Sequence, residues 1–133
     1  MDLGLKGLRA VVTGGTGAIG SEICRQLAAS GIRVLAIGHP TEIAQLPELH
    51  TRLTQNTPGI QVELADLADA DAAADVMARA EQALGPIDIL INAAGITRDA
   101  RFSKMSVDQW QAVLRSNLDS VFNCSKPVFE GMC

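Results

Sequence analysis

The chain has 133 residues, of which 47% are hydrophobic and 20% charged, a composition typical of a globular domain. Its formal net charge of −4 argues against a general nucleic-acid-binding protein, and its short apolar runs predict no membrane-spanning helix. Residues 1–4 lack the basic-then-apolar pattern of a signal peptide. The cysteines Cys24, Cys124 and Cys133 are odd in number and far apart, so they predict neither a disulfide framework nor a metal site and fit a reducing cytoplasm.

The first half of the chain alternates predicted strands and helices. Residues 8–13 are a short β-rich run that ends in glycines, and residues 32–37 are a second run of this kind. Between them, apolar residues recur at every fourth position, which predicts an amphipathic helix over residues 18–30. A less regular helix is expected within residues 42–56, begun or kinked by Pro47.

The second half continues the alternation. Residues 60–64 and 87–91 predict the third and fourth strands. Asp69 is placed to cap the helix between them, whose inner face is expected to hold Ala73, Val76, Met77, Ala80 and Leu84.

A final helical region follows the fourth strand. Ser106 and Gln109 have the spacing of a capping box, which predicts that a helix begins there. Pro127 should kink this region or end its regular hydrogen bonding, and Trp110 is expected to pack in the core.

Four strand–helix pairs without a repeat or a linker predict an α/β fold with a doubly wound parallel sheet. The expected strand order is 3-2-1-4, which leaves the apolar fourth strand at an edge. Periodicity alone also allows a flavodoxin-like fold.

The glycines favour a Rossmann-type sheet. The segment 13–20, T-G-G-T-G-A-I-G, joins the first strand to the first helix and contains G-x-G-x-x-G at Gly15, Gly17 and Gly20. In this context the spacing indicates a dinucleotide site, because glycines let backbone N–H groups approach a pyrophosphate at the start of a helix. A plain strand–helix turn would need only one or two glycines.

The end of the second strand bears on the choice of cofactor. An acid there would bind the ribose hydroxyls of NAD. Here the strand runs into Gly38, His39, Pro40 and Thr41, with no acid before Glu42. This omission leaves room for a 2′-phosphate and favours NADP(H) over NAD(H). Gly38 and His39 are therefore candidate cofactor-binding residues, although His39 is also readily explained as an exposed loop histidine.

Motifs along the whole chain resemble the short-chain dehydrogenase/reductase family. They are Thr13-Gly14 with Gly20, Asp66-Leu67 after the third strand, and Asn92-Ala93-Ala94-Gly95 after the fourth. The segments 95–99 and 104–105, together with Trp110, Asn117-Leu118 and Phe122-Asn123, resemble acetoacetyl-CoA reductases and 3-oxoacyl-[acyl-carrier-protein] reductases in particular. Ala18 replaces a glycine of that family's loop, and with Gly17 the loop also resembles the extended branch that includes sugar-nucleotide epimerases.

The resemblance implies roles for individual residues. Along the pyrophosphate would lie Gly14, Gly15, Ile19 and Gly20, with Thr16 and Gly17 in the same cofactor loop. The adenine would contact Asp66 and Leu67, and the riboses would be supported by Asn92, Ala93, Ala94 and Gly95. Asn117 matches the asparagine that holds a water in the family's proton relay, and it is the one catalytic residue carried over. Its neighbour Ser116 is expected on ordinary helix surface.

The family's catalytic serine and Y-x-x-x-K pair have no counterpart, because the chain has no tyrosine and ends at Cys133. Residues 1–133 are therefore expected to be an NAD(P)-binding Rossmann domain, truncated after the helix that follows the fourth strand and inactive alone. The resemblance implies NADP(H)-dependent reduction of a 3-oxoacyl thioester and a homo-oligomer, dimer or tetramer, in the full-length protein. The charge and the short apolar runs predict no nucleic-acid or membrane partner. A non-catalytic dinucleotide-binding module and half of an extended-type epimerase or dehydratase are the alternatives.

Overall fold

Four parallel strands form one sheet in the computed structural model, which describes residues 2–55 and 57–133. The strands are β1 (Arg9–Thr13), β2 (Arg33–Gly38), β3 (Ile60–Leu64) and β4 (Ile89–Asn92). Their order is β3-β2-β1-β4, and β1 pairs in parallel with both β2 and β4. The predicted order 3-2-1-4 is thus confirmed, and the flavodoxin-like order, in which β3 would lie beside β1, is excluded.

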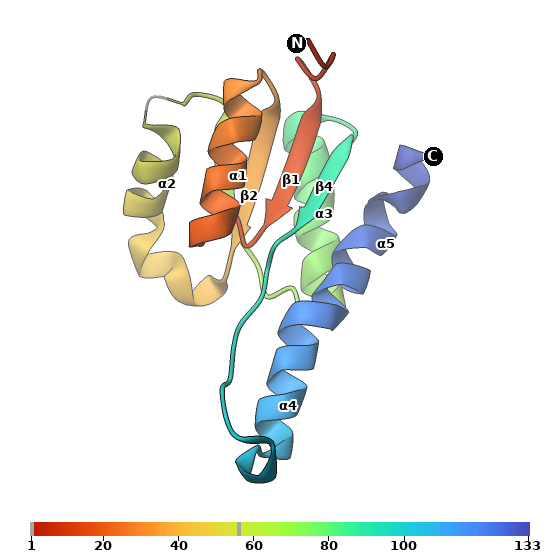
Figure 1. The fold of residues 1–133 in the computed structure, drawn as a ribbon. Helices are drawn as coiled ribbons and strands as arrows, with labels where there is room; N and C mark the ends of the chain where they lie inside the picture. Colours follow the sequence, from red (N-terminus) through yellow and green to blue (C-terminus); the bar gives the residue numbers. More distant parts are fainter. Residues whose placement is uncertain (1, 56) are drawn as a thin grey trace.

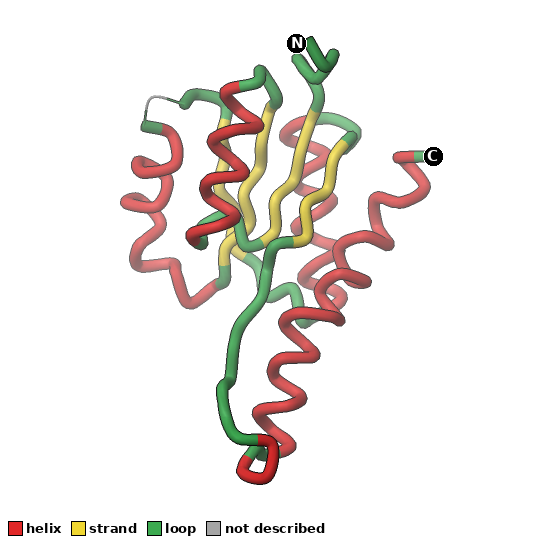
Figure 2. The backbone as a smooth tube through the Cα atoms, in the orientation of Figure 1, coloured by secondary structure: helices red, strands yellow, loops and turns green. Residues whose placement is uncertain are grey.

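Helices cover both faces of the sheet (Figure 1). In front of it lie α1 (Ala18–Ala29) and α2 (Leu46–Thr54), and behind it lie α3 (Ala70–Leu84) and α5 (Ser120–Met132). Two 3-10 helices, η1 (Pro40–Gln45) and η2 (Phe102–Lys104), precede α2 and α4 (Val107–Leu114). A π-helical segment, η3 (Arg115–Asp119), joins α4 to α5, so that the three form one continuous helical rod (Figure 2).

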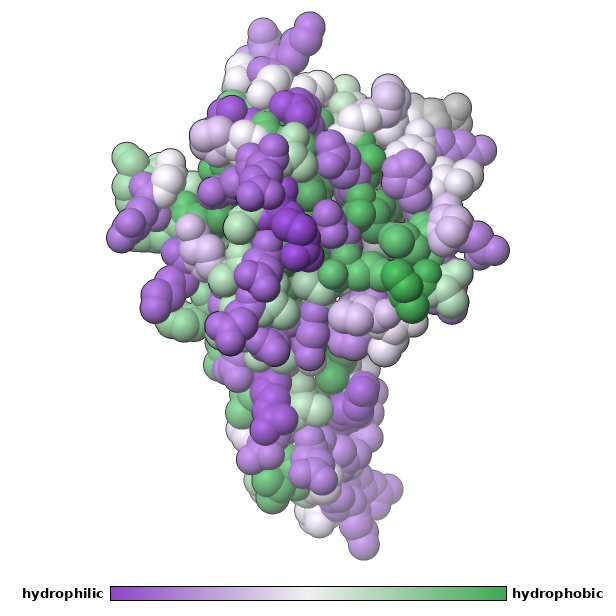
Figure 3. All heavy atoms as spheres, turned by 180° about the vertical axis from the view of Figure 1, so that it is seen from behind, coloured by the Kyte–Doolittle hydropathy of each residue, from purple (hydrophilic) through white to green (hydrophobic). Residues whose placement is uncertain are grey.

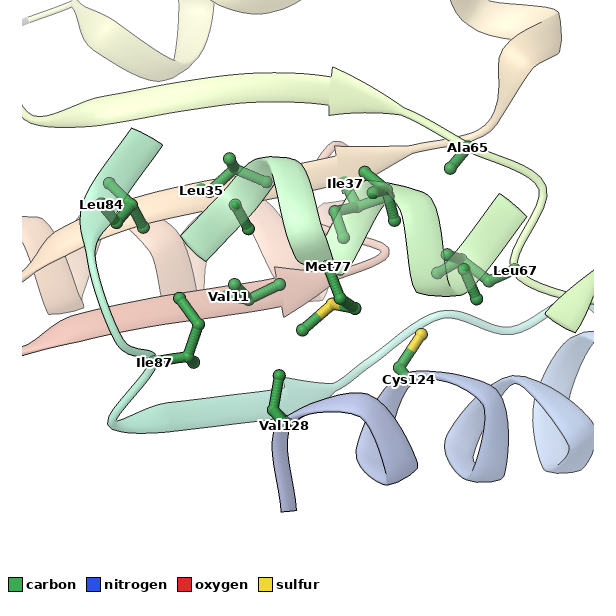
Figure 4. Packing of buried hydrophobic residues seen from close by; sticks show 13 residues of the cluster. Val11, Leu35, Ile37, Ala65, Leu67, Met77, Leu84, Ile87, Cys124 and Val128 are labelled. Atoms are coloured by element: carbon green, nitrogen blue, oxygen red, sulfur yellow. The ribbon is translucent and has the colours of Figure 1, made fainter. Parts of the chain in front are cut away.

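The sheet separates two hydrophobic clusters, because successive side chains of a strand point to opposite faces. Val11 of β1 packs with α3 and α5, whereas Ala10 before it packs on the side of α1. All five residues predicted for the inner face of the third helix are buried in the first cluster. Figure 4 shows this cluster, with Met77 of α3 lying among Val11, Cys124 and Val128. The two residues of α5 therefore fix the end of the helical rod to the back of the sheet.

Two helix starts follow the local sequence signals. The Asp69 carboxylate accepts hydrogen bonds from two N–H groups of the first turn of α3, at 2.9 and 3.1 Å. Ser106 and Gln109 form the predicted capping box at the start of α4, where each side chain bonds the other residue's backbone N–H. Both predictions are confirmed. Such caps stabilise a helix start because they bind N–H groups for which the helix itself has no acceptor.

The final helical region differs from the prediction at Trp110. This side chain is 56% exposed rather than packed in the core, because α4 projects beyond the sheet and none of its residues is buried. Pro127 lies inside α5, which continues to Met132 instead of ending there. Cys124 and Val128 lie one turn apart and are buried in the core, which holds α5 in place on both sides of the proline.

Among the described residues, most of the large apolar side chains that are exposed lie on the helical rod. Among its residues, those more than 60% exposed are Val107, Leu118, Phe122 and Phe129. By contrast, the centre of the back face, over α3, is largely hydrophilic (Figure 3). Of the helices in residues 2–55 and 57–133, none combines the length and apolarity needed to cross a membrane.

Candidate functional site

A crevice of about 670 Å³ opens at the carboxyl ends of the strands. Its walls are the loop between β1 and α1, the end of β2 with η1, the turn after β3, and the segment after β4. Open α/β sheets bind their ligands at this place, where the chain winding reverses between β1 and β4. The predicted site residues that line it are Gly14, Thr16, Gly17, Ile19, Gly20, Gly38, His39, Asp66, Leu67, Ala93, Ala94 and Gly95.

Thr13 and Gly14 join the β1 loop to the segment after β4. The Thr13 hydroxyl accepts hydrogen bonds from the N–H groups of Ala93 and Ala94, both at 3.1 Å, and donates one to the Ile91 carbonyl at 3.4 Å. Gly14 has φ of +64°, and a Cβ there would lie 2.6 Å from the Ala93 carbonyl oxygen. Both the backbone conformation and the close approach therefore exclude a side chain. These contacts hold the β1 loop against the segment after β4 at the edge of the crevice.

The N-terminus of α1 faces the crevice without a cap. The helix begins after Gly17 with no side-chain capping bond, and its first turn contains no acidic residue. Gly20 in this turn lies so close to Gly14 that a Cβ would overlap its backbone. First-turn N–H groups lack partners within a helix, and the positive end of the helix dipole lies there. The result is a cradle with free N–H groups and no room for a side chain at Gly14 or Gly20, which fits a pyrophosphate group.

Gly15 lies beneath this loop rather than on the crevice. A Cβ at Gly15 would lie 2.6 Å from the Cβ of Ala36 in β2, so the missing side chain lets the loop rest on the sheet. Cys24 of α1 is buried under the same loop, with Sγ 3.9 Å from the Gly15 carbonyl oxygen. Burial raises the pKa of Cys24 to about 11, and that of Cys124 likewise to about 11. Both thiols are therefore packing groups and not nucleophiles at neutral pH.

An acid does reach the end of β2, contrary to what the sequence suggested. The turn at η1 is held by two bonds to His39: its Nδ1 accepts from the Thr41 N–H at 3.2 Å, and its carbonyl accepts from the Glu42 N–H at 2.9 Å. This turn brings the Glu42 carboxylate back over Gly38, where Oε2 accepts a hydrogen bond from the Thr16 hydroxyl at 2.7 Å. The premise that no carboxylate lies at this place is therefore wrong. The 3-10 helix η1 folds the chain back, so that Glu42 lies beside the end of β2 although it follows the strand in the sequence.

The turn after β3 presents Asp66 and Leu67 to the crevice. The Asp66 Oδ1 accepts a hydrogen bond from the Ala68 N–H at 3.1 Å, which closes a local turn. The Leu67 carbonyl accepts one from Asn123 Nδ2 of α5 at 2.9 Å. This wall of the crevice is thus tied to the helical rod behind the sheet.

Asn117 fastens the segment after β4 to the rod. Its Oδ1 accepts a hydrogen bond from the Ile96 N–H at 2.8 Å, and its Nδ2 donates one to the Ile96 carbonyl at 3.1 Å. It also lies against Gly95, where a Cβ would be 3.3 Å from its Cγ. Asn117 belongs to η3, and π-helical turns of this kind are frequent at functional sites.

A family model described as short chain dehydrogenase matches residues 9–133. The chain belongs to the short-chain dehydrogenase family. Acetoacetyl-CoA reductase from Allochromatium vinosum is 44% identical over 123 residues, which cover 92% of this chain and 50% of that relative. Acetoacetyl-CoA reductase from Rhizobium meliloti is also 44% identical, with 92% and 48% covered. The chain thus spans about half the length of the curated relatives it matches.

Solved structures of this family share the fold. A short-chain dehydrogenase/reductase from Serratia marcescens superposes with a TM-score of 0.86 at 28% identity, covering 96% of this chain and 52% of that one. The Pseudomonas aeruginosa RhlG/NADP active-site complex gives a TM-score of 0.83 at 30% identity, covering 94% and 48%.

In this family member, three predicted site residues do not line the crevice: Gly15, Asn92 and Asn117. Asn92 instead donates from Nδ2 to the Ser125 hydroxyl at 3.3 Å. Ser116, which the sequence placed on ordinary helix surface, does line the crevice. The extra residue of the π turn changes which side chains face inward, and no spacing rule in the sequence marks it.

Proposed function

We propose that this chain is the dinucleotide-binding part of a reductase that transfers a hydride from NADP(H) to the ketone of a 3-oxoacyl thioester. The observation that carries the proposal is the anion cradle, in which the uncapped N-terminus of α1 meets a loop with no room for a side chain at Gly14, Gly15 or Gly20. The relatives named acetoacetyl-CoA reductase support the substrate class. The bound NADP named for RhlG supports NADP(H), with NAD(H) as the alternative cofactor.

In this proposal the dinucleotide supplies the hydride, and the chain binds and orients it. The glycine loop holds the pyrophosphate, Asp66 and Leu67 contact the adenine, and residues 92–95 support the riboses. Asn117 keeps its proposed place in the proton relay: its Oδ1 accepts one hydrogen bond from Ile96, and an amide oxygen has a second lone pair for a water.

The reduction also needs a general acid that this chain does not contain. The family's tyrosine protonates the alkoxide that forms as hydride arrives, and this sequence has no tyrosine. General acid catalysis contributes roughly 10²–10⁴ in rate, so the chain alone should bind a dinucleotide but turn over negligibly. The acid, its lysine partner and the serine would come from residues other than these 133.

Dinucleotide binding is tested by placing a charge in the cradle. Ile19, in the first turn of α1, is 75% exposed and lines the crevice. Ile19→Asp adds a carboxylate that favours the helix but repels a pyrophosphate, whereas Ile19→Asn is its neutral match. By titration calorimetry the wild type and Ile19→Asn should bind NADP⁺ or NAD⁺ below millimolar, and Ile19→Asp at least about tenfold more weakly. Absence of binding to the folded wild type would refute the proposal.

Catalysis is tested by mixing the chain with the second half of an acetoacetyl-CoA reductase that carries Y-x-x-x-K. NADPH oxidation dependent on acetoacetyl-CoA should appear with the mixture and not with either half. A matched second half with the tyrosine changed to phenylalanine should give no such rate. Dinucleotide binding without any rate in the mixture would instead favour the non-catalytic binding module.

A further inference from the structure

The end of β2 carries an unusual arrangement of charge for a site that would take a phosphorylated ribose. Glu42 Oε2 lies over Gly38 and accepts a hydrogen bond from the Thr16 hydroxyl at 2.7 Å. A Cβ at Gly38 would overlap this oxygen, so the glycine makes the room that the carboxylate occupies. Thr16 is 6% exposed and belongs to the glycine loop, which fixes the position of its hydroxyl.

Two carboxylates are among the ionisable groups around this part of the crevice. Glu42 lines it from η1, Asp66 lines it from the turn after β3, and His39 lies between them at the end of β2. Arg52 of α2 donates from Nη2 to the Thr16 carbonyl at 3.1 Å, but it does not line the crevice. Arg98, the lining arginine, comes from the segment after β4. Glu42 is the charged group that lies directly over Gly38, so a dianionic phosphate placed there would meet its carboxylate.

We infer that Glu42 is a specificity-determining residue that opposes the 2′-phosphate of NADP(H) and favours the 2′-hydroxyl of NAD(H). The inference rests on the proposed dinucleotide function, and within it favours the alternative cofactor, NAD(H), over NADP(H). A ribose at the end of β2 would bring its 2′-substituent to this carboxylate, which accepts a hydrogen bond from a hydroxyl and repels a phosphate. To admit NADP(H), Glu42 must leave Gly38 and release the Thr16 hydroxyl, and that rearrangement adds to the repulsion.

Glu42→Gln removes the negative charge of this side chain while it keeps the size of the side chain. Glutamine has the same shape and can still accept a hydrogen bond from Thr16, so the fold at η1 should persist. Two probes that differ only in the 2′-phosphate, ADP-ribose and 2′-phospho-ADP-ribose, report on this end of the site without the nicotinamide. In the variant the affinity for 2′-phospho-ADP-ribose should rise at least about tenfold, because one like charge close to the phosphate is removed. The affinity for ADP-ribose should change less than about threefold or weaken, since it loses a charge-assisted bond.

Glu48→Gln is the matched control, because Glu48 lies in the first turn of α2, is exposed, and does not line the crevice. It makes the same change of charge and should leave the ratio of the two affinities as in the wild type. If circular dichroism shows that Glu42→Gln is unfolded, Glu42→Ala serves as a second neutral variant. An unchanged ratio in a folded neutral variant would overturn the role of Glu42 while leaving the dinucleotide function intact. Failure of every folded variant to bind either probe would overturn both.

Discussion

Replacing Thr13 by valine should destabilise the junction that closes the crevice. The Thr13 side chain is 1% exposed, and its hydroxyl accepts the N–H groups of both Ala93 and Ala94 at 3.1 Å. Valine nearly matches the shape of threonine but leaves these two donors without an acceptor. Each partly buried N–H without a partner costs about 1–3 kcal/mol, so losing the acceptor of both should lower the free energy of unfolding of Thr13→Val by about 2–6 kcal/mol. Urea unfolding followed by circular dichroism measures this loss.

Thr13→Ser separates the hydroxyl from the methyl group. Serine keeps the acceptor for Ala93 and Ala94 and removes one methyl, which should cost about 1 kcal/mol. Amide hydrogen exchange at residues 93 and 94 should accelerate in Thr13→Val and stay close to wild type in Thr13→Ser. A valine variant as stable as the serine variant, with both amides still protected, would refute the assignment of the hydroxyl as the tie between β1 and β4.

Three further substitutions probe other parts of the structure. Gly14→Ala should lower the free energy of unfolding by about 2 kcal/mol or more, because a left-handed alanine costs about 1–2 kcal/mol and its Cβ would also press on the segment after β4; chemical denaturation checks this. The Arg9 side chain and N–H, both bonded to Asp88, hold the pKa of that carboxyl below its usual range. Their stabilisation should be complete above about pH 3.9 and be lost as the pH falls through the lower folded pKa, and unfolding curves of Asp88→Asn against pH should lack this dependence. Asn117→Ala removes two hydrogen bonds and should cost about 1–2 kcal/mol, whereas equal midpoints in urea would show that the bonds contribute nothing.

The fold could be predicted because its signals are local. The spacing of apolar residues, the Asp69 cap and the capping box at Ser106 each act within one element, and the glycine loop then fixes which α/β order is present. The start of α2 was less certain because a 3-10 helix precedes it and Pro47 lies in its first turn. Trp110 was misjudged because an apolar residue is buried only if another element covers it, and α4 projects past the sheet.

The candidate site could be predicted less completely, because parts of it depend on where turns return the chain. The glycine loop and residues 93–95 line the crevice as expected, since each directly follows a strand. Glu42 was missed because it lies beyond the strand and comes back through η1. Ser116 was missed because a π turn, and not an α turn, sets its direction. Sequence spacing shows neither kind of turn.

Cofactor binding and catalysis should be separable in this family member, because hydrogen bonds within the described residues tie the glycine loop and the rod to the segment after β4. Thr13 bonds Ala93, and Asn117 bonds Ile96, so the segment after β4 is held at both of these residues. In the proposed reaction the general acid comes from residues outside these 133, so neither tie depends on it. Adding a second half with Y-x-x-x-K should therefore raise turnover from a negligible level while changing the Kd for the dinucleotide much less. A dinucleotide affinity that appears only in the mixture would show instead that the cradle needs the second half to form.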